Sequence, residues 1–462
     1  GLTICPARGR PIVASGPGGM RIAAGVPSLD LEGRLGETPI RITSGPVGFA
    51  YPGVMTARAV DVSLGPVGTA SRFRVSDLQA RVGEDVSGTF SDADIALAAV
   101  PMNLEQANGD WRFANGELTI ENAAFTLVDR NRPARFEPLI ARGAALALID
   151  NIIDARAEMR HPSSDRLVTA VDIRHDLASG GGYADIDVPG IEFDETLQPD
   201  QLSQLALGII ANADGIVTGT GRIDWSPDGT ITSTGAFSSE DLDFAAAFGP
   251  VEGASGTVEF TDLLNLTTAP GQTIRVGSVN PGIEVLDGEV QFELRNGELL
   301  AVSGGSWPFM GGRLILREVN LNLGAEEERR YIFEIVGLDA AVFVERMEVG
   351  NLSATGLFDG TIPIVFDRNG NGRIDTGVLI SRPPGGNISY VGELTYEDLS
   401  AIANFAFDAL KSLDYTQMRV IMEGPLTGEI VTRVRFDGVS QGEDAKSNFI
   451  TRRLAALPLQ FR

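Results

Sequence analysis

One segment of the sequence has the residue types and spacing of a calcium-binding loop. Oxygen-bearing side chains stand at its first, third, fifth and ninth positions: Asp367, Asn369, Asn371 and Asp375. Such a loop also needs glycine at the sixth position, here Gly372, and a bidentate glutamate at the twelfth, here Val378. The flanking residues 362–366 and 378–381 are strand-like. We therefore interpret the segment as a hairpin turn, with weak calcium binding as the alternative.

A second segment, residues 438–442, has the Gly-x-Ser-x-Gly pattern of a nucleophile elbow around Ser440. That geometry needs a strand, a sharp turn and then a helix, and residues 442–446 are a poor helix start. The two histidines, His161 and His175, both precede the serine, against the usual order. With few proton shuttles or soft-metal ligands, we predict no enzyme activity, no cofactor and no metal, and keep an esterase as an alternative.

The charge of the chain excludes one class of partner. It carries 62 acidic and 37 basic side chains in 462 residues, a formal charge of −25. Such a chain repels phosphate backbones, so we expect no nucleic-acid partner, and it would also be repelled by an anionic membrane face. The single cysteine, Cys5, rules out an internal disulfide. No run of about 18 apolar residues is present, and we interpret the chain as part of a longer protein.

Short segments of alternating apolar and polar residues cover most of the sequence. Between residues 289 and 294, Val290, Phe292 and Leu294 alternate with polar residues, so a strand would place them on one face. From 313 to 323 the alternation slips by one residue near Arg317, as at a β-bulge. With 55 glycines and 24 prolines as turn formers, the pattern predicts a mainly β, elongated and repetitive antiparallel sheet whose apolar face holds something greasy.

We expect one continuous body with an amino-terminal part, residues 1–195, and a carboxy-terminal part, residues 196–462. Helical periodicity predicts amphipathic helices near 200–212 and 396–413. Shorter helical turns are expected at 239–248 and 340–347.

Several stretches share a pattern of structural glycines, prolines and aromatic residues: Asp224-Trp225, Ser233 to Gly235, Leu242 to Gly253, Phe260 to Leu263, Ala269 to Gln272, Asn280 to Ile283, Trp307-Pro308-Phe309, Gly356 to Ile364, and Phe407 to Leu410 with Tyr415. In these stretches the sequence, from about residue 165 to the end, resembles the YdbH branch of the AsmA-like envelope proteins. Because the likeness is carried by structural residues, it identifies a family rather than a site.

The resemblance implies a curved, taco-shaped sheet with an apolar concave groove. It further implies a periplasmic protein, tethered to the inner membrane of a Gram-negative cell by a segment missing from this chain, that moves phospholipid between the inner and outer membranes. The same branch also carries an older label, dicarboxylate transport domain, which is less informative. The expected partners are therefore phospholipid and the two membranes.

The alternating pattern then names the residues expected to line the groove on successive strands. These are Val258, Phe260, Val290, Phe292, Leu294, Leu314, Leu316, Phe333 and Ile335. A sandwich core sealed by a second sheet would show the same alternation, because a facing sheet and a lipid tail both require apolar side chains. The competing function is a structural or assembly factor that captures β-strands of outer-membrane proteins at open sheet edges.

Overall fold

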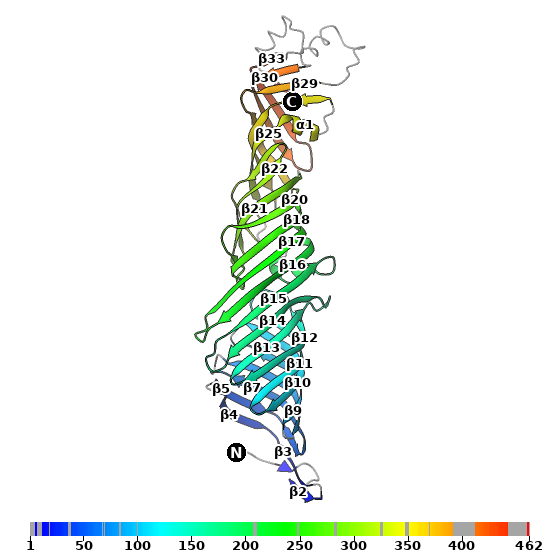
Figure 1. The fold of residues 1–462 in the computed structure, drawn as a ribbon, viewed down its shortest axis with the longest axis vertical. Helices are drawn as coiled ribbons and strands as arrows, with labels where there is room; N and C mark the ends of the chain where they lie inside the picture. The colour runs from blue at the N-terminus through cyan, green and yellow to red at the C-terminus, as the bar shows by residue number, and fades with distance from the viewer. Residues whose placement is uncertain are drawn as a thin grey trace. The chain divides into compact units, whose positions relative to one another are not determined.

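The protein, represented by a computed structural model, is built almost entirely of β-strands (Figure 1). The structure describes residues 5–6, 12–17, 19–35, 38–66, 68, 70–82, 85–98, 100–206, 210–246, 249–280, 284–323, 327–346, 351–368, 370–390, 412–441 and 460–461. Contacts divide the chain into two compact units. Unit 1 comprises Gly1–Ser239 and Glu259–Thr268, and unit 2 comprises Glu240–Val258 and Ala269–Arg462.

Unit 1 is an antiparallel sheet in which, from β7 to β16, each strand pairs with the next one in the chain. At its amino-terminal end, β3 pairs with β6 and β5 with β7. Its strands are β1 (Cys5–Pro6), β2 (Val13–Gly16), β3 (Gly19–Val26), β4 (Leu29–Leu35), β5 (Thr38–Ser44), β6 (Val47–Tyr51), β7 (Gly53–Leu64), β8 (Ser71–Val82), β9 (Val86–Ala96), β10 (Met102–Ala114), β11 (Glu117–Asp129), β12 (Leu139–Ile149), β13 (Ile152–Arg160), β14 (Leu167–Asp176), β15 (Gly182–Phe193), β16 (Ile210–Trp225) and β19 (Thr267–Thr268). Two strands are shared between the units: β17 (Ile231–Ala246) and β18 (Gly249–Asp262).

Unit 2 continues with antiparallel pairing and adds a small four-stranded sheet made of β26, β29, β30 and β33. Its strands are β20 (Gln272–Val279), β21 (Val285–Arg295), β22 (Leu299–Phe309), β23 (Gly312–Leu316), β24 (Val319–Asn322), β25 (Arg329–Asp339), β26 (Leu352–Ala354), β27 (Leu357–Phe366), β28 (Gly372–Ser381), β29 (Gly386–Tyr390), β30 (Ser412–Tyr415), β31 (Gln417–Pro425), β32 (Val431–Asp437), β33 (Ser440–Gln441) and β34 (Gln460–Phe461). Its α-helix is α1 (Ala340–Arg346). The predicted mainly β, antiparallel fold is confirmed.

The slip in the alternation near Arg317 is also confirmed. The chain leaves β23 at Leu316 and enters β24 at Val319, and both strands pair with β22. In a regular strand, residues on one face are an even number of positions apart, but Leu316 and Leu321 are an odd number apart and are both buried. The irregularity between β23 and β24 therefore keeps both leucines on the apolar face.

Successive strands of unit 1 carry a β-bulge near their middle. The pairing register shifts between β9 and β10, β10 and β11, β11 and β12, and β12 and β13. A residue with positive φ marks the bulge in four successive strands: Asp92, Gln106, Asn122 and Gly143. A bulge bends its strand and increases the local twist. Because these bulges are neighbours across the sheet, they bend it along one line.

The helix predictions fared unevenly. Residues 340–347 were expected to form a helical turn, and α1 confirms this. The predicted turn at 239–248 is wrong, because Leu242, Phe244 and Ala246 have the two-residue period of strand β17. Residues 391–411, which hold most of the helix expected at 396–413, lie outside the described residues, and Ser412 and Leu413 belong to β30.

The amphipathic helix expected at 200–212 is wrong for the described residues. They form two short 3-10 helices, η1 (Pro199–Gln201) and η2 (Gln204–Ala206), and Ile210 already starts β16. The reason lies just before the segment. The Gln198 side chain hydrogen-bonds to the backbone of Ala213 in β16, through Nε2 to O at 2.9 Å and Oε1 to N at 2.8 Å, which ties this turn to the strand.

Candidate functional site

The calcium-loop-like segment is the turn between β27 and β28, as its flanks predicted. Asp367 Oδ1 accepts from Asn371 N at 2.9 Å and Asp367 Oδ2 from Asn371 Nδ2 at 3.0 Å. Asp375 pairs with Arg330 at 2.8 Å and with Arg373 at 3.2 Å. Asn369 lies outside the described residues. The carboxylates are thus used within the protein, and no group of three metal-ligating side chains forms in the described part of the chain.

The nucleophile-elbow pattern has no strand-turn-helix geometry in the described residues. Gly438, with φ of 64°, makes the turn before Ser440, but Ser440 itself lies in the short strand β33. Residues 442–459, where a helix would have to follow, lie outside the described residues. The two histidines have other partners: His161 Nδ1 lies 2.9 Å from Ser164 Oγ, and His175 Nδ1 accepts from Trp225 Nε1 at 3.0 Å.

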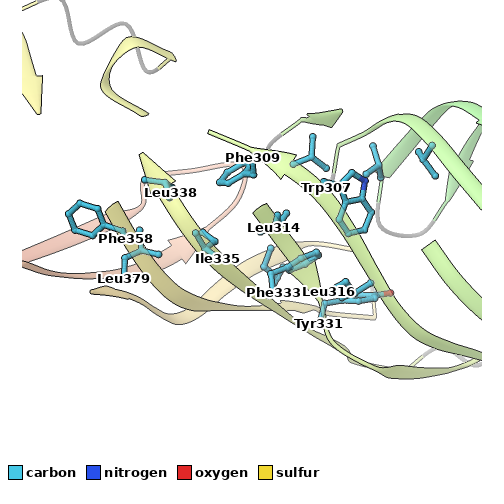
Figure 2. Close-up of a cluster of buried hydrophobic side chains, with 14 of the residues drawn as sticks. Trp307, Phe309, Leu314, Leu316, Tyr331, Phe333, Ile335, Leu338, Phe358 and Leu379 are labelled. Carbon is cyan, nitrogen blue, oxygen red and sulfur yellow. The ribbon is translucent and has the colours of Figure 1, made fainter. Parts of the chain in front are cut away.

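In unit 2, cross-strand pairing brings most of the predicted groove residues onto adjoining rows of one apolar face. Val290 pairs with Gly305, Gly305 with Leu316, and Leu316 with Phe333. Leu314 pairs with Ile335. Figure 2 shows Leu314, Leu316, Phe333 and Ile335 in the same buried cluster as Trp307.

These predicted residues differ in how far they are covered. Leu314, Leu316, Phe333 and Ile335 are buried by the packing of unit 2 itself, with Ile335 only 2% exposed. Val290, Phe292 and Leu294 are only partly buried, as is Val258. Phe260 belongs to unit 1, where it is partly buried with its ring centroid 5.9 Å from that of Phe237.

Trp307 packs over two glycines of this unit 2 face. A Cβ added at Gly288 would lie 2.0 Å from its Cδ1, and one added at Gly305 would lie 2.6 Å from its Cη2. The indole therefore lies flat over the two glycines, which leave room for it because they have no side chain. This packing fills the face with protein side chains.

Unit 1 presents an apolar face that the list of predicted groove residues did not include. A single file of residues, each the direct cross-strand partner of the next, runs from β9 to β16, and we name it the apolar row: Gly88, Trp111, Ile120, Leu146, Ala155, Ile173, Ala184 and Ile223. The larger side chains Trp111, Ile120, Leu146 and Ile173 are only partly buried. An apolar surface thus extends across successive strands without being sealed.

Beside the apolar row, small residues fill the line of bulges. Ala93 pairs with Ala107, and Ala123 with Ala144, and we name these four residues the alanine crease. All are buried, with Ala93 1% and Ala107 3% exposed. The alanine crease therefore carries only methyl groups, whereas larger side chains such as Ile120 and Leu146 lie in the apolar row.

The opposite face of the same strands is polar. Asp154 pairs with Arg174 at 2.8 Å, and Asp185 with Arg222 at 2.7 Å, all four on exposed positions of neighbouring strands. The Arg222 guanidinium also lies 3.9 Å from the centroid of the Tyr183 ring. Exposed ion pairs of this kind add little stability but keep the face hydrated. The apolar contact surface of unit 1 is therefore one-sided.

His175 lies beside Trp225 in unit 1. Burial lowers the pKa of His175, whereas a hydrogen bond with the Gly181 backbone and the charge of Asp176 act in the other direction. The neutral imidazole then accepts the Trp225 N–H. Trp111 is different: its buried Nε1 has no hydrogen-bond partner among the described residues.

The sequence matches the model of the YdbH-like family, described as intermembrane phospholipid transport protein YdbH, over residues 3–449. The chain belongs to this family. No curated protein and no solved structure matches it. The predicted resemblance is confirmed, and membership associates the YdbH-like chain with phospholipid transport between membranes of the cell envelope.

The described part of this YdbH-like chain has no helix that is both long and apolar enough to span a bilayer. Its apolar surface is instead carried by strands. The predicted groove residues lie on strands β18, β21, β23 and β25. The apolar row needed the pairing register, because bulges at residues such as Gln106 and Asn122 change which residues become neighbours.

Proposed function

We propose that the apolar row and the partly buried side chains around it bind the acyl chains of phospholipid without covalent chemistry. The lipid moves along this surface between the inner and outer membranes of a Gram-negative envelope, and the protein acts in the periplasm while tethered to the inner membrane. One observation carries the proposal: an uninterrupted apolar file across β9 to β16 whose large side chains stay partly exposed, backed by a polar face.

The dimensions support this role. The apolar row crosses seven strand-to-strand steps, and at about 4.8 Å per step it is about 34 Å long. The hydrocarbon core of a bilayer is about 30 Å thick. A surface of this length accommodates extended acyl chains, which a pocket for a small substrate would not.

The energetics also favour such a surface. Keeping a methylene out of water is worth about 0.8 kcal/mol, so carrying two chains of about fifteen carbons each through water costs on the order of 20 kcal/mol. A continuous apolar face lowers this barrier at each step, because every carbon that leaves the membrane gains a protein contact.

In this proposal the two units contribute differently. In unit 2, the partly buried Val290, Phe292 and Leu294 contact lipid directly. The more deeply buried Leu314 and Ile335 lie on adjoining rows of the same face and pack against other protein side chains.

Photo-crosslinking tests the proposal on one strand. A photoreactive amino acid replaces Ile173 in one variant and Asp172 in its matched control, which puts the probe on the apolar or the polar face of β14. After irradiation of Gram-negative cells producing the full-length protein, mass spectrometry should find phospholipid adducts at Ile173 and few at Asp172. Equal adducts at both positions, or none at either, would overturn the proposal. Adducts with outer-membrane proteins instead of lipid would favour strand capture.

A further inference from the structure

Two loops of unit 1 lie over part of its apolar face. The first strap, residues 130–138, connects β11 to β12, and the second strap, residues 194–203, follows β15. They are joined to each other: Glu137 N donates to Leu202 O at 2.8 Å, and Ser203 Oγ donates to Arg135 O at 2.7 Å. The straps therefore form one cover although they are far apart in the sequence.

The first strap is anchored to the sheet by Asp129, the last residue of β11. Its side chain is 0% exposed and accepts from Arg135 Nε at 2.8 Å, Arg135 N at 2.9 Å and Asn131 N at 3.1 Å. Burial alone would raise the pKa of Asp129, but these hydrogen bonds and the Arg135 charge outweigh it, and the pKa lies below its usual value. The carboxylate thus holds the strap as an anion.

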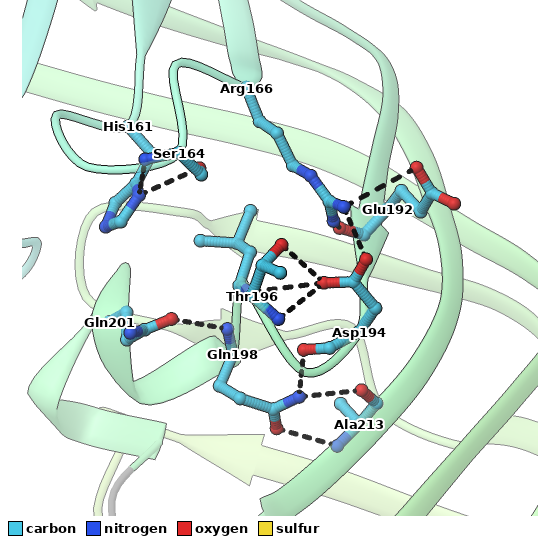
Figure 3. Close-up of polar contacts among 10 residues, drawn as sticks. His161, Ser164, Arg166, Glu192, Asp194, Thr196, Gln198, Gln201 and Ala213 are labelled. Carbon is cyan, nitrogen blue, oxygen red and sulfur yellow. Dashed lines mark hydrogen bonds and ion pairs between the residues drawn. The ribbon is translucent and has the colours of Figure 1, made fainter.

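The base of the second strap is anchored equally firmly. Asp194 accepts from Arg166 and, at 2.7 Å, from Thr196 N, while Gln198 Nε2 donates to Asp194 O at 2.7 Å (Figure 3). Leu197 between them is 0% exposed. Residues 194–198 are thus fixed by several hydrogen bonds and a fully buried side chain.

The tip of the second strap, residues 199–203, is less buried than its base, because none of its residues is fully buried. Leu202 O and Ser203 Oγ bond the tip to the first strap, and Gln201 Oε1 accepts from Gln198 N at 2.8 Å. The Leu202 side chain is partly buried against a cluster on the sheet: Leu139, Ala141, Met159 and Val168, with Val171 and Ile191 beside it. A base with a fully buried side chain and a more exposed tip are the components of a hinged cover.

We infer that the tip of the second strap is a gate, and that Leu202 occupies the place an acyl chain takes on this part of the apolar face. The inference rests on the proposed function. Lipid displaces Leu202, the bonds that Leu202 O and Ser203 Oγ make to the first strap break, and residues 194–198 stay in place as the hinge. The exposed carbonyl and hydroxyl then bond to water, so opening leaves no buried polar group unpaired.

The first test compares lipid contact under the gate with contact outside it. A photoreactive residue at Val171 reports on the covered cluster, and one at Leu146 reports on the apolar row outside that cluster. Each is combined in the full-length protein with Leu202→Ser or with the control Gln204→Ser, which changes an exposed residue directly after the second strap, at the start of η2. Vesicles of phosphatidylethanolamine and phosphatidylglycerol supply the lipid.

Leu202→Ser should increase lipid adducts at Val171 at least threefold and leave those at Leu146 unchanged, whereas Gln204→Ser should change neither. If adducts form at Leu146 but the two variants give the same yield at Val171, the gate is refuted and the proposed function stands. If adducts form at neither position, the proposed function itself fails.

The second test measures movement. In a Cys5→Ser background, spin labels at Gln204→Cys on the strap segment and Asp172→Cys on the polar face of β14 report the distance between strap and sheet. Loading with the same vesicles should add a second, longer distance. An unchanged distance in protein that carries lipid adducts at Val171 would overturn the gate.

Discussion

The apolar row makes a quantitative prediction about lipid affinity. Ile120, Leu146 and Ile173 are direct neighbours or near neighbours in the row and are all partly buried. Full burial of an isoleucine or leucine side chain is worth about 1.5–3 kcal/mol. Because the protein already covers part of each side chain, about 1 kcal/mol per residue is left for a ligand to gain, on the same scale.

Replacing all three with serine should therefore weaken phospholipid binding by about 3 kcal/mol, or about 100-fold in Kd. Titration of the protein with a fluorescent phospholipid measures the change directly. Thermal unfolding of the same variant must accompany it, since the substitutions also remove contacts inside unit 1.

The control changes three exposed residues on the polar face of neighbouring strands: Asp154→Ser, Asp172→Ser and Asp185→Ser. Exposed ion pairs contribute at most about 1 kcal/mol, so affinity should change less than about fivefold. A folded triple variant of the apolar row that binds lipid as tightly as the parent would refute the assignment of lipid to this face.

Three single substitutions test other contacts, each by urea unfolding. Because the pKa of His175 is lowered in the folded protein, the unfolded chain binds more protons just below about pH 6.5. The free energy of unfolding therefore rises with pH in this range, and this stability is lost as the pH falls through the folded-state pKa. The variant His175→Gln should flatten this pH dependence, and an equal slope in the two proteins would contradict the assignment. Asp129→Asn should lower the free energy of unfolding by about 3 kcal/mol at pH 7, because it leaves the partly buried Arg135 guanidinium without its carboxylate. An unchanged urea midpoint would contradict this. Gly288→Ala should lower the free energy of unfolding by about 1–3 kcal/mol, since its Cβ would lie 2.0 Å from Trp307. The control Gly33→Ala, whose Cβ would have its nearest contact 3.8 Å away, should leave it unchanged. Equal urea midpoints for the two variants would contradict the packing of Trp307 over Gly288.

The fold was predictable because side chains alternate between the faces of a strand, whatever the tertiary context. Val290 and Phe292 could be placed on one face from spacing alone, and even the slip near Arg317 was visible. The same rule was missed at Leu242, Phe244 and Ala246, where a helical turn was predicted but the residues belong to β17. The segment after Pro199 failed for another reason: its conformation depends on the bond between Gln198 and a distant strand.

The candidate site was only partly predictable. Apolar alternation does not reveal whether a residue becomes covered, so Ile335 and Phe292 looked equivalent although one is buried and the other partly exposed. The alanine crease had no signal of its own, because alanine is unremarkable in a strand pattern. Its role comes from bulges at Gln106 and Asn122, which become evident only when the strands are paired.

Charge and bending together restrict how lipid can approach unit 1. The chain has a formal charge of −25, so an anionic headgroup is repelled by the protein as a whole. On the polar face, ion pairs such as Asp154–Arg174 and Asp185–Arg222 keep the surface hydrated. The alanine crease carries only methyl groups on β9 to β12, whereas the apolar row carries larger side chains such as Ile173. In the proposed function, acyl chains therefore gain most contact along the apolar row, and the headgroup stays in water. Recognition in this proposal depends on the chains, so changing the headgroup should matter less than shortening them.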